Sequence, residues 1–297
     1  MMATMTVVEM SADDVASFEA ARRRSEALAY RMLGSMVDAQ DVVQDAWLRW
    51  ERLGPAGRAD VANPAAWCTT VVTRIALDRL RSARRQREEY VGPWLPEPVA
   101  TTPDPAETVE LAESLTIGFL AVLERLGPIE RATFLLADVF GEPYARIAEV
   151  VGRSEDACRQ AASRARRRVR DERHGAPPAN ADELLGAFLA ACARGDVDSL
   201  RGLLAADAVL VSDGGALVHA ARRPVRGPER ITRLLVNLAG RMPPELQIEP
   251  TSVNGEPGFV GRLGHTPVMV VALEVRGATI GAVHIQVNPV KLGGFAA

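Results

Sequence analysis

Apolar side chains recur at helical spacing through the first 90 residues of the chain. The period runs through residues 15–50, where the segment 28–50 is predicted to be one continuous helix, and the glycine- and proline-rich residues 54–57 interrupt it. Asn63-Pro64 is typical of an N-cap followed by a first helical turn, which predicts a helix over residues 65–87. This part of the chain is therefore predicted to be all-helical.

A proline-rich segment separates these helices from a second helical group. Residues 92–105 hold five prolines and no helical period, which predicts a linker, and Pro105 is predicted to open a helix that carries Leu115. Three short helices are predicted within residues 128–174, with a tight glycine break at Gly152.

From residue 181 the pattern becomes mixed. Helices are predicted over residues 183–194, 197–205 and 228–239. The other runs are β-branched and broken by glycine, which is typical of an antiparallel sheet, so this part is predicted to be a separate α+β domain. The strand-like runs are residues 208–215, 246–253, 258–264, 266–277 and 278–290.

Composition places the chain among globular proteins: 47% of its residues are hydrophobic and 25% are charged. No run approaches the ~18 apolar residues of a membrane helix, and no basic flank of a secretory signal precedes the first apolar stretch. The three cysteines lie far apart, which argues against a disulfide framework or a cysteine zinc site. A reducing cytoplasm is the expected compartment, and no membrane partner is expected.

The net charge of −3 conceals an uneven distribution. Residues 91–152 hold 3 basic and 10 acidic side chains, whereas residues 153–174 hold 8 arginines against 4 acids. A pI near 5.9 argues against a nucleic-acid partner only when these two segments are averaged.

Residues 143–170 are typical of a helix-turn-helix, with a glycine turn before a helix that Ser154 caps. In this motif the start of the second helix meets base edges, and arginines further along meet phosphates. The plain alternative is a surface helix with a solvated arginine face. The candidate DNA contacts are Ser154, Arg159, Gln160, Ser163, Arg164 and Arg167.

Two earlier segments carry further candidates. In residues 28–50 the acids could equally make ordinary charge pairs on a helix surface. In residues 63–87 the arginines are suited to phosphates, and Trp67 could stack on an unpaired base, although a core position is commoner for such a tryptophan. The candidates of the first segment are Asp38, Asp41, Gln44, Asp45 and Arg49. Those of the second are Asn63, Trp67, Arg74, Asp78, Arg81, Arg84, Arg85 and Arg87.

Together these segments resemble a bacterial sigma factor of the extracytoplasmic-function class over nearly all of residues 10–174. AYRMLGSMVDAQDVVQDAWLRW resembles regions 2.1–2.2, which implies binding to the β′ clamp helices of core RNA polymerase by the first candidate set. NPAAWCTTVVTRIALDRLRSARR resembles regions 2.3–2.4, which open and read the −10 promoter element. LGPIERATFLLADVFGEPYARIAEVVGRSEDACRQAASRARRRV resembles region 4, which reads the −35 element and meets the β flap.

Three short motifs narrow the resemblance to the subgroup with a fused SnoaL-like C-terminal domain. They are WLPEP at residues 94–98, DGG at 213–215 and NPVKL at 288–292. The subgroup pattern is DGGGK and NPDKL, so Ala216, Leu217 and Val290 depart from it. The resemblance implies that the extra domain regulates the sigma factor in cis. The implied interdomain contacts are Trp94, Leu95, Pro96, Glu97, Pro98, Asp213, Gly214, Gly215, Asn288, Pro289, Lys291 and Leu292.

The predicted fold is therefore multidomain, with two all-α sigma domains, the second containing a helix-turn-helix, and a C-terminal α+β SnoaL-like cone. The predicted divisions are residues 10–90 for region 2, 91–110 for the linker, 111–174 for region 4 and 180–297 for the cone. The predicted function is promoter-directing sigma activity controlled in cis.

Other function classes make distinct demands on the sequence. Domains of this kind can be enzymes that use Asp and His, but no nucleotide or nucleophile motif is present, and no catalytic residue, metal or cofactor is expected. The histidines available to such a site are His219, His265 and His284, beside Asp213. A polymerase-independent helix-turn-helix regulator whose cone binds a small ligand stays open as the alternative.

Overall fold

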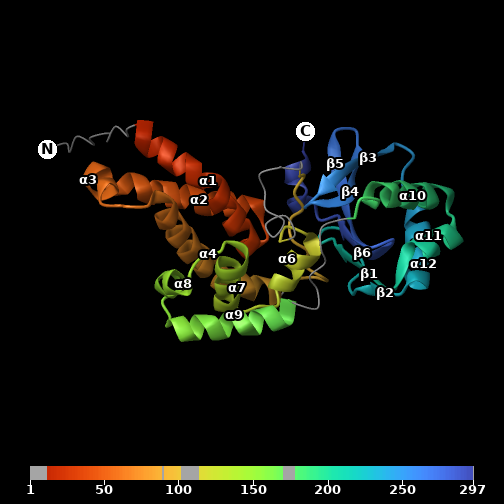
Figure 1. The fold of residues 1–297 in the computed structure, drawn as a ribbon. Helices are drawn as coiled ribbons and strands as arrows, with labels where there is room; N and C mark the ends of the chain where they lie inside the picture. Colours follow the sequence, from red (N-terminus) through yellow and green to blue (C-terminus); the bar gives the residue numbers. More distant parts are fainter. Residues whose placement is uncertain (1–11, 89, 102–113, 170–177, 297) are drawn as a thin grey trace. The chain divides into compact units, whose positions relative to one another are not determined.

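The computed structural model describes residues 12–88, 90–101, 114–169 and 178–296. The chain divides into two compact units. Figure 1 shows the ribbon, with colours that follow the sequence from the N-terminus to the C-terminus. The described residues of 1–83 and 128–164 form the first unit, and those of 84–127 and 165–297 form the second. Each unit is described by itself.

The first unit is helical. Its elements are α1 (Ala12–Leu33), α2 (Met36–Arg52), α3 (Gly54–Ala59), α4 (Pro64–Glu88), α7 (Pro128–Phe134), the π-helix η1 (Leu135–Val139), α8 (Tyr144–Val151) and α9 (Glu155–Val169). The last residues of α4 and of α9 are counted with the second unit. Leu28, Met32, Val42 and Trp50 of α1 and α2 are almost fully buried. The side chain of Asn63 accepts from the amide of Ala66 at 3.0 Å, so the predicted N-cap of α4 is confirmed.

Three predictions for helical segments were wrong. The helix predicted over residues 28–50 is broken, because Gly34 adopts a positive φ of 69° and Ser35 caps a new helix. Residues 54–57, predicted as a break, begin the short helix α3. Leu115 lies in a turn, and α6 (Ile117–Leu123) begins after Thr116, whose hydroxyl accepts from Phe119 N. Pro105 lies outside the described residues.

The second unit is built on a six-stranded sheet in the order β2-β1-β6-β5-β4-β3. The strands are β1 (Leu204–Asp213), β2 (Val225–Arg226), β3 (Leu246–Val253), β4 (Glu256–Leu263), β5 (Thr266–Arg276) and β6 (Thr279–Gln286). The sheet is mixed and not wholly antiparallel as predicted, because β1 pairs with β6 in parallel. A long crossover through α12 (Pro228–Ala239) and the β3–β5 meander permits this pairing.

The two faces of this sheet have different covers (Figure 1). On one face α10 (Ala181–Arg194), α11 (Val197–Leu203) and α12 pack, and Phe188, Leu200 and Leu273 fill the core. On the other face lie the linker, α6 and the short 3-10 helices η3 (Pro289–Lys291) and η4 (Gly293–Phe295), with Leu95 and Ile117 in a second apolar core. The linker is therefore part of the second unit's core.

Gly258→Ala in β4 should destabilise the second unit, because an added Cβ would overlap the carbonyl oxygen of Val271 on the neighbouring strand. The expected loss is about 1–3 kcal/mol, typical of overpacking in a core. Gly186→Ala in α10 is the matched control, since nothing lies within 4 Å of its added Cβ, and it should gain up to about 1 kcal/mol. Calorimetric unfolding of the full chain measures both. Equal transitions for the two variants would contradict the close strand packing.

Candidate functional site

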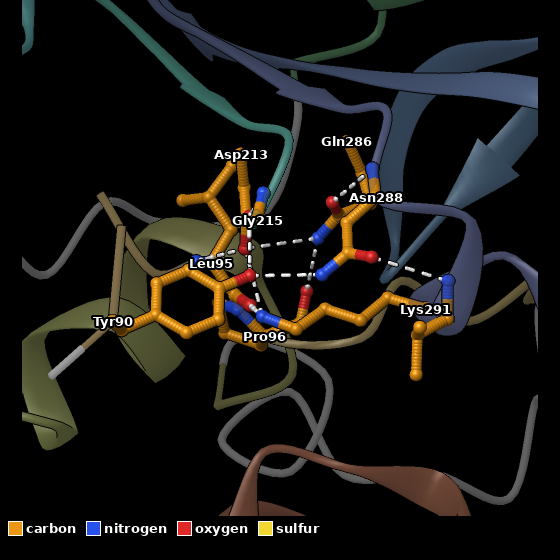
Figure 2. Close-up of polar contacts among 9 residues, drawn as sticks. Tyr90, Leu95, Pro96, Asp213, Gly215, Gln286, Asn288 and Lys291 are labelled. Carbon is orange, nitrogen blue, oxygen red and sulfur yellow. Dashed lines mark hydrogen bonds and ion pairs between the residues drawn. The ribbon is translucent and has the colours of Figure 1, made fainter. Parts of the chain in front are cut away.

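The carboxylate of Asp213, at the end of β1, joins the sheet to the linker (Figure 2). Its side chain is fully buried. Oδ1 accepts from Tyr90 Oη at 2.6 Å and from Gly215 N at 3.0 Å. Oδ2 accepts from Leu95 N at 2.9 Å and pairs with Lys291 Nζ at 2.7 Å. A buried carboxylate needs this many donors; of the residues that supply them, Leu95 lies in the linker and Tyr90 directly precedes it.

Lys291 is the second centre of the same network. Its ammonium donates to Leu95 O at 2.6 Å and lies 4.2 Å from the centre of the Trp94 ring and 5.0 Å from that of Tyr90. Burial and the neighbouring Asp213 raise the pKa of Tyr90, so the phenol stays protonated and donates. We call Tyr90, Trp94, Leu95, Asp213, Asn288 and Lys291 the linker clamp.

Asn288 completes the clamp and explains one glycine of the DGG motif. Its Nδ2 donates to Tyr90 Oη at 2.9 Å, and its Oδ1 accepts from Val290 N at the start of η3. Gly215 has a φ of +57°, and a Cβ there would lie 2.7 Å from Asn288 Nδ2. Gln286, beside Asp213 in register across β1 and β6, reaches Pro96 O at 3.5 Å.

The structure thus brings the three sequence motifs together through Leu95, Asp213, Asn288 and Lys291. Leu95, Pro96, Glu97 and Pro98 are all buried. The departures from the subgroup pattern lie outside the clamp: Leu217 is 68% exposed and Val290 74% exposed. Their side chains are therefore not needed for the contacts that hold the linker.

The end of the linker is tied to the turn between β3 and β4. Asn254 N donates to Val99 O, and Asn254 Oδ1 accepts from Val99 N, both at 2.8 Å. The amide of the same side chain donates to Leu115 O at 2.9 Å, just before α6. Sequence reasoning missed Asn254, although the pair Asn254-Gly255 between two strand-like runs is a usable hairpin signal, and the structure gives Asn254 the positive φ of 54° that such a turn needs.

Buried ionisable groups lie beneath the start of α6. Glu256 Oε2 accepts from Ile117 N at 3.2 Å, and burial together with Glu274 raises the pKa of Glu256 to about 8. Burial lowers the pKa of His284 to about 4, and its Nδ1 has no hydrogen-bond partner among the described residues. Sequence reasoning also missed Glu256 as a contact, because a carboxylate in a strand gives no sign of which helix it meets.

The acidic candidates on α2 form a row beside α4. Asp38, Asp41 and Asp45 approach Arg79 at 3.7, 3.5 and 3.1 Å. Gln44 and Arg49 are exposed on the same helix. Arg79 was not predicted, since only the packing of α4 against α2 reveals it.

Two arginines join α4 to α8 in the first unit. Arg74 donates to the carbonyl oxygens of Glu149 and Val150 at the end of α8, at 2.9 and 3.2 Å. Arg146 of α8 donates to Ala66 O and Thr70 Oγ1 near the start of α4, both at 2.7 Å. The guanidinium of Arg74, a predicted DNA contact, is therefore engaged by the helix-turn-helix.

The other candidates on α4 are placed as follows. Trp67 packs edge-on against Trp50 with ring centres 5.1 Å apart, and it is only half-buried. Asp78 and Arg81 form an exposed pair at 3.0 Å. The side chains of Arg84, Arg85 and Arg87 lie outside the described residues.

The second helix of the helix-turn-helix, α9, exposes its predicted contacts. Ser154 Oγ accepts from Ala157 N, which confirms the predicted N-cap, and Gln160, Ser163 and Arg167 are exposed. Arg159 bonds Glu155 at 2.6 Å and Asp156 at 3.2 Å on its own helix. Arg164 bonds Glu130 of α7 at 2.8 Å.

The chain is similar to known proteins in both sequence and structure. Residues 18–86 match the family model of Sigma-70 region 2, and residues 118–169 match that of Sigma-70 region 4. The chain is 40% identical to the ECF RNA polymerase sigma factor SigJ of Mycobacterium tuberculosis, over 95% of this chain and 94% of that protein. It is 33% identical to the probable ECF sigma factor SigI of that species, over 89% and 90%. The crystal structure of SigJ matches with a TM-score of 0.75 and 37% identity, covering 94% of this chain and 98% of SigJ.

The chain belongs to the ECF family of RNA polymerase sigma factors. It is a promoter-specific sigma factor, and its partners are core RNA polymerase and promoter DNA, which sigma regions 2 and 4 bind. The family consists of transcription initiation subunits and not of enzymes. In the described part of the chain, no helix is long and apolar enough to cross a membrane.

Region 4 of this sigma factor is divided between the two compact units. Its first helix, α6, packs on the sheet of the second unit, whereas α7 and α8 belong to the first unit with region 2. The predicted domain boundaries were drawn from the resemblance to a sigma factor family, whereas the two units are defined by which residues pack together. The units therefore do not test these boundaries, which stay a prediction.

Glu256→Gln should remove a pH dependence of stability. Glu256 has a pKa of about 8 in the fold and 4.5 as its ordinary value, so between about pH 5 and 8 only the folded chain holds this proton. The free energy of unfolding should therefore fall as pH rises through this window, on the order of 1 kcal/mol per pH unit. Glutamine stays neutral and can still accept from Ile117 N, so the variant should lose that fall.

Urea unfolding of parent and variant at several pH values measures the difference. His284, whose pKa is lowered, contributes the opposite slope between about pH 4 and 6.5 in both proteins, so it cancels in the comparison. Parallel curves for the two proteins would show that Glu256 is ionised in the fold.

Proposed function

We propose that the C-terminal domain controls this sigma factor in cis by holding the linker through the linker clamp and the start of α6 through Glu256. The conclusion rests on one observation: the buried carboxylate of Asp213 takes donors from both the linker and the domain. Pulling the linker away would leave a buried charge without Tyr90 Oη and Leu95 N. Such a loss is costly, so the clamp favours the held state.

The packing of α4 against α8 in the first unit explains why we propose that the sigma factor is inactive while the domain holds the linker. Arg74, a proposed −10 contact, is bound by α8, and the start of α4 is bound by Arg146. Engagement of promoter DNA by both regions would require α4 and α8 to separate. We propose that the domain opposes that separation, because the clamp restrains the linker and Glu256 restrains α6.

The residues predicted from the sequence keep their roles in this proposal. Core polymerase would bind the candidate residues on α2, once the three aspartates have released Arg79 of α4 and paired with the polymerase instead. These residues are Asp38, Asp41, Gln44, Asp45 and Arg49. Residues 63–87 would capture the melted −10 strand, and the helix that begins after Ser154 would read the −35 element. The acidic linker segment and the docked domain would leave the free protein a poor binder of promoter DNA.

A catalytic role for the C-terminal domain has little chemical support. Both oxygens of Asp213 are occupied by donors, and the cavity beside His284 has a volume of about 10 Å³, room for about one water. His219 and His265 are exposed. We therefore propose that this domain binds and does not turn over a substrate. A cavity of about 290 Å³ between Gly92 and Arg222 would be the place for a small ligand.

Lys291→Met should raise transcription from a target promoter several-fold, because it removes the ion pair with Asp213 and the bond to Leu95 O. Asp213→Asn combined with Lys291→Met should do the same without leaving a buried charge unpaired. In-vitro transcription with core polymerase and the full chain measures the effect. Arg201→Met is the matched control, since it breaks an exposed pair with Asp198 away from the linker.

Unchanged transcription by both clamp variants would overturn control by the clamp. Deletion of residues 175–297 is a coarser comparison, because it would also uncover Leu95 and Ile117, which the domain buries. Equal activity of that truncation and the full chain would likewise count against inhibition in cis.

Arg159→Ala should reduce discrimination between −35 sequences, because Arg159 lies near the start of α9, where base edges are read. Arg167→Ala should weaken binding about equally for all sequences and reduce its salt dependence, as expected for a phosphate contact. Holoenzyme binding to promoter variants at several salt concentrations measures both. Salt-insensitive losses in both variants would show that α9 does not read DNA.

A further inference from the structure

The C-terminal domain carries a cluster of positive charge that its overall neutrality conceals. Residues 175–297 hold 11 basic and 11 acidic side chains, yet residues 219–241 hold six arginines and only one carboxylate, Glu229. The rest of the domain is correspondingly acidic. Five of the arginines lie within residues 222–233, and we call them the basic face: Arg222, Arg223, Arg226, Arg230 and Arg233.

Ion pairing separates the basic face from the remaining basic residues of the domain. Every basic residue of the domain outside residues 219–241 has an acidic partner within 4.0 Å: Arg194, Arg201, Arg262, Arg276 and Lys291. All five arginines of the basic face are exposed, and none has an ion pair or side-chain hydrogen bond with any described residue. Positive charge left unneutralised in one place attracts an anionic partner.

The fold gathers these arginines at one edge of the domain. β2, which carries Arg226, is the edge strand of the sheet, and α12 follows it after Gly227 (Figure 1). Arg230 and Arg233 are one turn apart on the exposed side of α12, opposite the buried Ile231 and Leu235. No side chain caps the start of α12, so its free amides and helix dipole add to the positive potential there.

We propose that the basic face binds the phosphate backbone of the DNA that this sigma factor engages. Arginine guanidinium groups bind phosphate oxygens in pairs and stay charged. The face has no aromatic platform for unpaired bases, so the contact would be independent of sequence. Regions 2 and 4 bring DNA to the same chain, which gives this weak contact a high effective concentration. The inference uses no residue of the linker clamp and does not rest on it.

Arg226→Gln combined with Arg230→Gln tests the proposal in the holoenzyme, formed from core polymerase and the full chain. The probe is a labelled DNA duplex of mixed sequence, titrated at several salt concentrations. The double variant should make the slope of log K against log salt shallower by up to about 1.8, since each lost phosphate contact accounts for ~0.9. Neither side chain has a partner among the residues that the structure describes, so the unfolding temperature should not change.

Arg194→Gln combined with Arg201→Gln is the matched control, because it removes the same charge from exposed arginines that are already paired. If both double variants changed the salt slope equally, the effect would come from the net charge of the chain and not from the basic face, and the proposal would be overturned. An unchanged slope for the basic-face variant, while Arg167→Ala still lowers it, would also overturn it. Weaker binding to core polymerase without DNA, with the slope unchanged, would assign the face to an acidic protein surface instead.

Discussion

The buried carboxylate of Asp213 is the constraint on which the second unit depends. A charge removed from water must be matched by donors, and Asp213 takes them from a tyrosine, two backbone amides and a lysine. Because Leu95 lies in the linker and Tyr90 directly precedes it, we expect the folded C-terminal domain and the bound linker to stabilise each other. The same sheet face then binds α6 through Glu256, so region 4 of the sigma factor begins on the C-terminal domain.

In the first unit, arginines join helices by donating hydrogen bonds to carbonyl oxygens at helix ends. Arg74 binds the last carbonyls of α8, and Arg131, fully buried with its pKa lowered by burial to about 9, donates to Met32 O at the end of α1. Helix ends leave such oxygens without partners, and a guanidinium can satisfy two at once. Region 2 and the helix-turn-helix are thereby packed into one unit. This packing engages the guanidinium of Arg74, which is a predicted DNA contact.

The net charge of this protein says little about its partners unless the charged side chains are assigned to segments of the chain and to surfaces of the fold. The net charge of −3 averages an acidic linker segment with a basic recognition helix, and the neutral C-terminal domain repeats the pattern within itself. Sequence counts revealed the first contrast. For the second, counts show that arginines gather in residues 219–241, but only the structure shows which arginines of the domain have an acid within reach.

The sequence by itself determined the elements and the family. Periodicity placed α12 and β3 at their observed bounds, and the motifs around Leu95, Asp213 and Lys291 were recognisable one by one. Local capping rules also predicted the starts of α4 and α9, because a cap acts within three residues. Tertiary structure alone decided the parallel pairing of β1 with β6, the partners of Arg74 and Arg79, and the contact of Glu256 with α6. These contacts join residues tens to more than a hundred positions apart, and no local pattern encodes which distant group a side chain will meet.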